Sequence, residues 1–187
     1  MDALMVALVL GALTQASDRT PWLAAILADR LGRATTIVAL ILALAANYAI
    51  GVVGGRLLAP MMTPEAKLLL LALALALAGL GTGWRVVRPE ALERWRLPGA
   101  LTAFLGLLIM AFGDRMQFVV AALAARTDLP WAAAVGATLG AGLVGAAAAA
   151  IGETAWVALP LRAIRLAAAG ILTIAGIVVA LNALRLV

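Results

Sequence analysis

Two short charged motifs interrupt apolar stretches of this chain, and they are the residues best suited to chemistry. Asp18-Arg19 lies in an apolar run that begins near residue 3, and Asp114-Arg115 lies in another that begins near residue 99. A carboxylate can bind a cation or carry a proton, and a guanidinium can pair with a carboxylate. The type of chemistry these motifs predict is therefore ion or proton binding.

The composition argues against an enzyme. The chain has no histidine, the commonest general base, and no cysteine, which excludes disulfides and thiolate sites. No nucleophile motif is convincing, and we expect Glu153 to be a solitary acid near the end of an apolar segment. We expect neither an enzyme nor a bound cofactor.

The two charged motifs belong to an internal repeat. When residues 18–30 are placed over residues 114–126, six of thirteen positions are identical. Alanine and leucine matches carry little weight in so apolar a chain. The informative matches are the Asp-Arg pair and the arginine twelve residues after each aspartate, Arg30 or Arg126.

The elements that position these motifs are predicted to be membrane-spanning helices. Apolar residues make up 66% of the chain and charged residues 12%, and the mean hydropathy is +1.13, beyond the range of soluble domains. A helix needs about 20 apolar residues to cross a bilayer, and unpaired strands cannot satisfy their backbone in lipid. Six segments meet that length, two of them interrupted by the charged motifs: 3–28, 34–58, 66–84, 99–125, 131–151 and 163–184.

The repeat and the segment count together predict the architecture. We expect an all-α membrane protein of six transmembrane helices, built as two inverted three-helix repeats. The first repeat is 1–84, a cytoplasmic linker is 85–98, and the second repeat is 99–187. Because three spans is an odd number, the second repeat enters the membrane from the opposite face. Transporters of this design bind their substrate near the midplane, where interrupted helices meet.

The distribution of basic residues predicts the orientation. One side of the membrane collects eight arginines: Arg30, Arg33, Arg85, Arg88, Arg94, Arg96, Arg162 and Arg165. The other side collects four basic residues: Arg56, Lys67, Arg126 and Arg185. We therefore expect the linker in the cytoplasm and both termini outside, in a cell membrane such as the inner membrane of a bacterium. The start Met1-Asp2 lacks the basic region of a signal peptide, so we expect the first segment to be retained.

The four charges within the spans must be compensated. Each ionisable residue at the bilayer centre costs roughly 2.5–3.5 kcal/mol, or about 10 kcal/mol for all four if unpaired. Adjacent residues on a helix point in different directions, so Asp18 cannot pair with its own neighbour Arg19. We expect a reciprocal arrangement between the repeats, in which Arg19 pairs with Asp114 and Arg115 with Asp18.

Neighbouring oxygen atoms extend the candidate cation and proton site around Asp18 and Asp114. The spacing of three residues predicts that Gln15 shares a helix face with Asp18, and Gln117 with Asp114. Such oxygen ligands suit hard cations such as Ca²⁺ or Mn²⁺. The hydroxyl candidates beside the first motif are Thr14, Ser17 and Thr20.

Other residues in the spans allow a functional or a purely structural interpretation. Pro21 lacks an N–H, which predicts a kink and a carbonyl without a helical partner at Ser17; Gln117 in the second copy predicts no such break. Asn47 and Tyr48 could bind an ion, although hydrogen bonding between helices is the favoured explanation. Two pairs of glycines at a spacing of four predict close helix packing: Gly51 with Gly55, and Gly136 with Gly140.

The motifs resemble those of a known family. The Gdt-type cation/proton exchangers, which include transmembrane protein 165 and belong to the lysine-exporter-like superfamily, carry E-x-G-D-[KR]-[ST] once in each three-helix repeat. The copies here read QASDRT at 15–20 and AFGDRM at 111–116. The length, the six segments and the polar central loop are also similar to that family.

The resemblance implies exchange of Mn²⁺ or Ca²⁺ against protons by alternating access, with carboxylates from both repeats around the metal. Both aspartates of the motif are present, as Asp18 and Asp114, whereas both glutamates are replaced, by Gln15 and Ala111. Each motif therefore has a formal charge of zero instead of −1.

These departures leave two alternatives open. The chain could transport a different small solute, bound through Arg19 and Arg115, or it could be a non-transporting or partner-dependent membrane subunit of the same fold. The expected partners are the lipid bilayer, a divalent cation and protons, with a homodimer or heterodimer possible. We expect no nucleic acid partner, because positive loops at the cytoplasmic face explain the net charge of +5.

Overall fold

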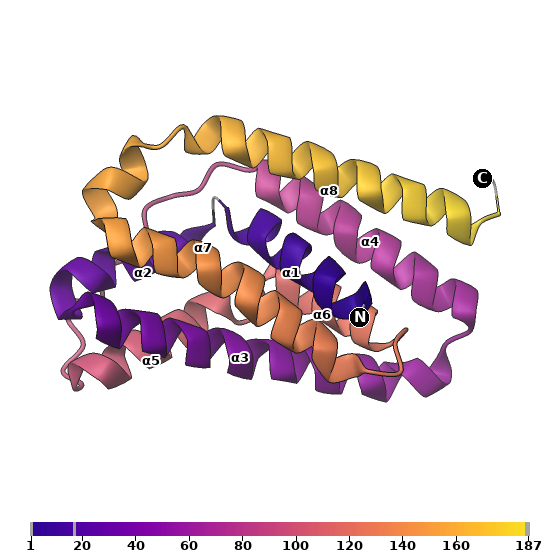
Figure 1. Cartoon of the computed structure of the whole chain (residues 1–187), viewed down its shortest axis with the longest axis horizontal. Coiled ribbons are helices and arrows are strands. Elements are labelled where there is room, and N and C mark those ends of the chain that lie inside the picture. The colour runs from indigo at the N-terminus through magenta and orange to yellow at the C-terminus, as the bar shows by residue number, and fades with distance from the viewer. Residues whose placement is uncertain (1, 17, 186–187) are drawn as a thin grey trace.

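The computed structural model describes residues 2–16 and 18–185, and within them it contains helices and no strand (Figure 1). The first half of the chain forms α1 (Asp2–Gln15), α2 (Arg19–Leu31), α3 (Arg33–Leu58), the short 3-10 helix η1 (Ala59–Met61) and α4 (Pro64–Gly83). The second half forms α5 (Gly99–Ala111), α6 (Arg115–Ala124), α7 (Pro130–Ala158) and α8 (Leu161–Ala183). Residues 84–98 connect the two halves without a helix.

Four helices of the described chain are long and apolar enough to cross a membrane by themselves: α3 with η1, α4, α7 and α8. Helices α5 and α6 qualify as a fifth span when taken together, although they are bent by 71° at their junction. The predicted first span is divided into α1, an apolar helix of 14 residues, and α2.

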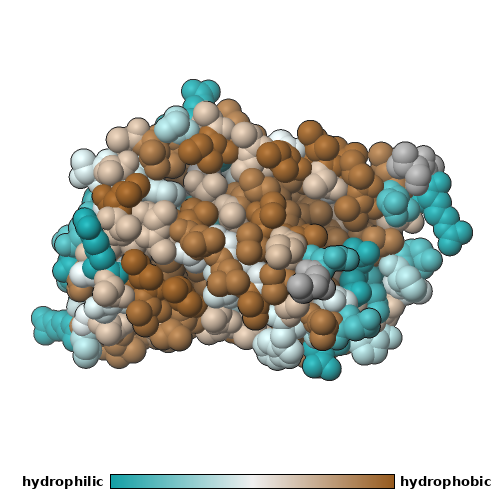
Figure 2. Space-filling model, viewed as in Figure 1, coloured by the Kyte–Doolittle hydropathy of each residue, from teal (hydrophilic) through white to brown (hydrophobic). Residues whose placement is uncertain are grey.

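The surface of the bundle is apolar where a membrane would cover it. Large apolar side chains are exposed along the outer faces of the long helices, among them Leu42, Leu77, Leu143 and Ile174. Figure 2 shows apolar residues across the middle of one face and hydrophilic residues gathered at its two ends. Exposed apolar area of this extent is typical of contact with lipid rather than water, and the chain is a multi-pass membrane protein.

Helices of the first half pack against helices of the second half. Helix α1 packs along α7, α3 packs along α5 and α6, and α4 runs antiparallel to α8 (Figure 1). The predicted role of the glycine pairs in close packing is confirmed. A Cβ atom on Gly55 would overlap the carbonyl oxygen of Ala121 in α6, and one on Gly140 would overlap that of Leu8 in α1.

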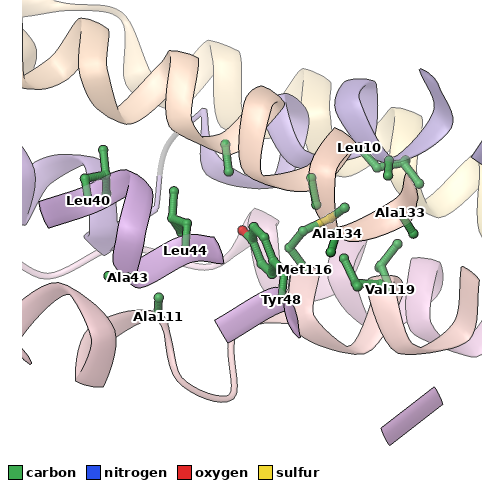
Figure 3. Close-up of a cluster of buried hydrophobic side chains, with 14 of the residues drawn as sticks. Leu10, Leu40, Ala43, Leu44, Tyr48, Ala111, Met116, Val119, Ala133 and Ala134 are labelled. Carbon is green, nitrogen blue, oxygen red and sulfur yellow. The ribbon is translucent and has the colours of Figure 1, made fainter. Parts of the chain in front are cut away.

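Small side chains allow the helices to meet around a few large ones. Tyr48 and Met116 are fully buried in a core that is otherwise rich in alanine, leucine and valine (Figure 3). Tyr48 comes from α3 and Met116 from the first turn of α6. The core therefore fixes α6, and the charged motif before it, against the first half of the chain.

Candidate cation site

Both aspartates lie at breaks between two short helices. Asp18 is the N-cap of α2, and Asp114 is the N-cap of α6. The second copy is interrupted at its charged motif without a proline, because α5 ends at Ala111 and α6 begins at Arg115. Gly113, between them, has φ of +73°, a conformation that glycine adopts without the strain of a side chain. The positive end of each helix dipole thus faces its own carboxylate.

Asp114 caps its helix in the usual way. Its carboxylate accepts a hydrogen bond from the backbone N–H of Gln117 at 2.7 Å. The Gln117 side chain reaches back and accepts from the N–H of Gly113 at 2.8 Å. This reciprocal arrangement is a capping box, and the sequence Asp-x-x-Gln carried that signal.

Asp18 does not cap its helix, and the reason is Pro21. The third residue of α2 is Pro21, which has no N–H for the Asp18 carboxylate to accept from. The predicted proline kink is therefore absent, since a proline in the first turn removes no helical hydrogen bond. The predicted free carbonyl and side-chain ligand at Ser17 lie outside the described residues. The Asp18 carboxylate is left available for other partners.

One of the two predicted ion pairs between the repeats is present. Arg115 Nη2 lies 2.5 Å from Asp18 Oδ1, and both side chains are largely shielded, with exposed fractions of 24% and 16%. In the described residues Arg19 forms no ion pair with Asp114, so the reciprocal half of the prediction was wrong. Arg19 is exposed, and the Asp114 carboxylate is occupied by other donors.

Gln15 contacts the opposite repeat instead of its own motif. Its Nε2 donates to Asp114 Oδ2 at 3.0 Å. The expectation that Gln15 and Asp18 share a helix face was wrong, because α1 ends at Gln15 and Asp18 belongs to the start of α2. The contact nevertheless joins the two motifs, since it links the first copy to the aspartate of the second.

A polar network continues from Gln117 into α3. The Gln117 Nε2 donates to the carbonyl oxygen of Asn47 at 3.2 Å. The Asn47 Nδ2 donates to the carbonyl oxygen of Ala111 at 2.6 Å, which satisfies a carbonyl at the end of α5. Asn47 therefore forms the interhelical hydrogen bond that was the favoured prediction for it. This bond stabilises the break between α5 and α6.

Several buried oxygen atoms near this network have no hydrogen-bond partner among the described residues: Gln15 Oε1, Thr20 Oγ1, Asn47 Oδ1 and the Tyr48 hydroxyl. The Tyr48 hydroxyl lies near Gln15 and Asp114. A buried polar atom without a partner costs about 1–3 kcal/mol, so such a group suggests a missing ligand. The Thr14 hydroxyl has a partner, because it donates to the carbonyl oxygen of Leu10 at 2.9 Å.

An open cleft of about 240 Å³ lies where the two motifs meet. Its lining comes from both copies: Asp18, Arg19, Met110, Phe112, Gly113, Asp114 and Arg115. Within the described ranges no group of three acidic, histidine or cysteine side chains is arranged to hold a metal. The cleft thus offers two carboxylates, the hard oxygen ligands that a divalent cation prefers, beside two guanidinium groups.

Sequence reasoning missed a second polar cluster at the end of α7. Glu153 is not solitary: it accepts from Trp22 Nε1 at 3.2 Å and from Arg88 of the linker at 2.6 and 2.9 Å. Just before it, α7 is kinked at Gly152, where φ is +81°. The freed N–H of Glu153 donates to Asp29 at 2.8 Å. The glycine was the only local signal of this kink.

A comparison with known protein families gave a match in the second half of the chain. The model of a family described as Divalent cation/proton antiporter GDT1 matches residues 99–186, the half of the chain that contains Asp114 and Arg115. The comparisons with curated proteins and with solved structures gave no match. The second half of the chain, residues 99–186, is therefore similar to the GDT1 family, in agreement with the resemblance of its motif to that of the Gdt-type exchangers.

Proposed function

We propose that this protein is a secondary transporter that exchanges a divalent cation, Mn²⁺ or Ca²⁺, against protons by alternating access. The observation that carries the proposal is the meeting of Asp18 and Asp114 in one cleft, each at the N-terminus of a helix that begins at a break. The family match of the second half supports the class of substrate. In this proposal Asp18 and Asp114 bind the ion and carry the protons.

The contacts between α4 and α8 support the proposed division into two inverted repeats, 1–84 and 99–187. Gly79 of α4 packs against Ala169 and Thr173 of α8, whereas Gly176 of α8 packs against Ala72 and Ala76 of α4. Each contact reproduces the other when the residue numbers are shifted by 97. Such reciprocity is what a pseudo-two-fold axis produces, and the antiparallel course of the two helices fits an axis in the membrane plane (Figure 1).

The chemistry of exchange follows from competition at the carboxylates. A divalent cation needs ionised oxygens, so it and protons compete for Asp18 and Asp114. The unpartnered oxygens of Gln15, Asn47 and Tyr48 are the neutral ligands we assign to the ion. Rocking of the repeats would expose the cleft to each side in turn, with the linker 85–98 in the cytoplasm and the termini outside.

Flux measurements with purified protein test the proposal. Proteoliposomes with an imposed pH gradient should take up Mn²⁺ or Ca²⁺, and dissipating the gradient should stop uptake. We expect Asp18→Asn and Asp114→Asn each to reduce the gradient-driven flux at least about 100-fold, because each removes a ligand and a proton carrier.

Glu65→Gln provides the matched control, since it also removes one carboxylate but from an exposed position at the start of α4. Its flux should equal that of the wild type. Gradient-driven flux that survives in both aspartate variants would reject the assigned roles.

A partner-dependent subunit is the second candidate, and the Asp18–Arg115 ion pair favours it. This pair occupies one of only two carboxylates in the cleft. If a partner chain with further carboxylates were required, the purified protein would show no flux alone, and adding the co-purified partner would restore it.

A further inference from the structure

The guanidinium of Arg115 lies where a bound cation would need to be. It contacts Asp18, one of the two carboxylates of the cleft, at 2.5 Å. The pair is largely shielded from solvent, with exposed fractions of 24% for Arg115 and 16% for Asp18. A shielded pair of this kind is not weakened by water as a surface pair is. The guanidinium and a transported cation cannot both take the same carboxylate oxygen.

Helix α4 provides a defined place for the Arg115 side chain. A Cβ atom on Gly81 would lie only 2.8 Å from Arg115 Cδ, so the arginine stem passes directly over this glycine. Gly81 lies in the last turn of α4, which ends at Gly83. The carbonyl end of a helix carries partial negative charge. The guanidinium can therefore leave Asp18 and still remain beside a favourable electrostatic environment.

The net charge of the cleft depends on whether the Arg115 guanidinium lies at Asp18 or at the end of α4. Asp18 and Asp114 contribute −2 to the lining, and Arg19 and Arg115 contribute +2, so the lining is neutral. With Arg115 displaced toward the end of α4, the lining has a net charge of −1 and attracts a divalent cation. A monovalent cation would replace one positive charge at Asp18 by another and gain little from the exchange.

We propose that Arg115 is a tethered counter-ion that competes with the transported cation for Asp18, and that Gly81 provides the space that positions it. This inference rests on the proposed function, because it presumes that a cation binds in the cleft. Arg115 then sets the affinity for the ion and disfavours monovalent ions. The exposed Arg19 holds the matching position in the first motif without such a pair among the described residues.

Binding titrations with Mn²⁺ on the purified full-length protein at fixed pH test the inference. We expect Arg115→Gln to lower the Kd about tenfold, a typical size for the coupling between two linked binding events. Arg19→Gln removes the same charge from the same cleft but breaks no ion pair, so its effect should be clearly smaller. The Arg115→Gln variant should also gain affinity for Na⁺, measured by competition against Mn²⁺.

A second pair of variants keeps the test decisive if Arg115→Gln does not fold. Gly81→Ala should push the arginine stem aside and tighten Mn²⁺ binding, whereas Gly83→Ala, whose Cβ would meet Ala169 at an ordinary 3.7 Å, should not. Equal affinities for Arg115→Gln and Arg19→Gln, or for the two glycine variants, would overturn the inference while leaving the transporter intact. Failure of the wild type to bind Mn²⁺ would instead reject the proposed function.

Discussion

At the scale of residues, the site depends on which donors reach Asp114. Gln15, which stands where the similar motif of the Gdt-type exchangers has a glutamate, donates its amide N–H to Asp114. An ionised glutamate could not donate this bond, so it would need a shared proton or a metal to lie at the same place. The glutamine thus keeps Asp114 hydrogen-bonded where a glutamate would make the contact depend on pH or metal.

Gln15→Glu should therefore strengthen metal binding. Two carboxylates within hydrogen-bond distance repel when both are ionised, and they share a proton until a cation replaces it. We expect Mn²⁺ affinity at neutral pH to rise about tenfold, with more protons released per bound Mn²⁺ than in the wild type. Isothermal titration in buffers of different ionisation enthalpy measures that release. An unchanged proton count would contradict this account of Gln15.

The residue pairs were only partly predictable from the sequence. The contact between Asp18 and Arg115 followed from the duplicated motif and from the cost of unpaired charge in a membrane. The contact between Arg19 and Asp114 did not form, because Gln15 and the backbone of Gln117 already occupy that carboxylate. Which donor binds the Asp114 carboxylate depends on where each helix breaks. Residue spacing that assumes a continuous helix does not give the position of the break.

At the scale of elements, the breaks and the glycine contacts determine how the cleft is held. The break before α6 needs Gly113 at positive φ and the capping box of Asp114 with Gln117. Its position was present in the sequence as Gly-Asp-x-x-Gln, whereas a lost helical hydrogen bond was predicted only in the first copy, at Pro21. Proline in a first turn marks a helix start, and this explains why the predicted kink was not found.

The close packing of α1 on α7 can be tested with two glycine-to-alanine variants, one at the contact and one away from it. Gly140→Ala should lower the free energy of unfolding by about 1–3 kcal/mol, because its Cβ would overlap the backbone of Leu8 and force the helices apart. Gly54→Ala, in α3 with nothing within 4 Å of the added atom, should be neutral or gain up to about 1 kcal/mol. Unfolding of the purified protein in detergent measures both. Equal stability of the two variants would contradict the close contact.

At the scale of the whole molecule, apolar helices predominate and hydrophilic residues gather at the two ends (Figure 2). The long spans α3, α4, α7 and α8 could be predicted because each is long and apolar enough to cross a membrane. The pairing of α4 with α8 could not, because alanine and glycine recur in every span and do not specify a partner. The cluster of Asp29, Arg88 and Glu153 also required the tertiary structure, since its members are far apart in the sequence.

The predicted orientation can be tested by cysteine labelling, because the chain has no cysteine of its own that would react with the reagent. Single-cysteine variants Glu90→Cys in the linker and Asp128→Cys in the α6–α7 loop place one thiol at each end, both at exposed positions. A membrane-impermeant maleimide added to intact spheroplasts should label Asp128→Cys at once and Glu90→Cys only after permeabilisation. The opposite labelling pattern would reverse the assignment of the linker to the cytoplasm.

The central claim is that residues of both repeats form one cation site. Anomalous scattering from Mn²⁺ in crystals of the protein tests it most directly, because the signal locates the ion without reference to transport. The account predicts a single peak in the cleft, within about 2.5 Å of a carboxylate oxygen of Asp18 and of Asp114, with Arg115 moved away from Asp18. A peak that contacts only one of these aspartates, or Mn²⁺ bound elsewhere with the cleft unchanged, would contradict it.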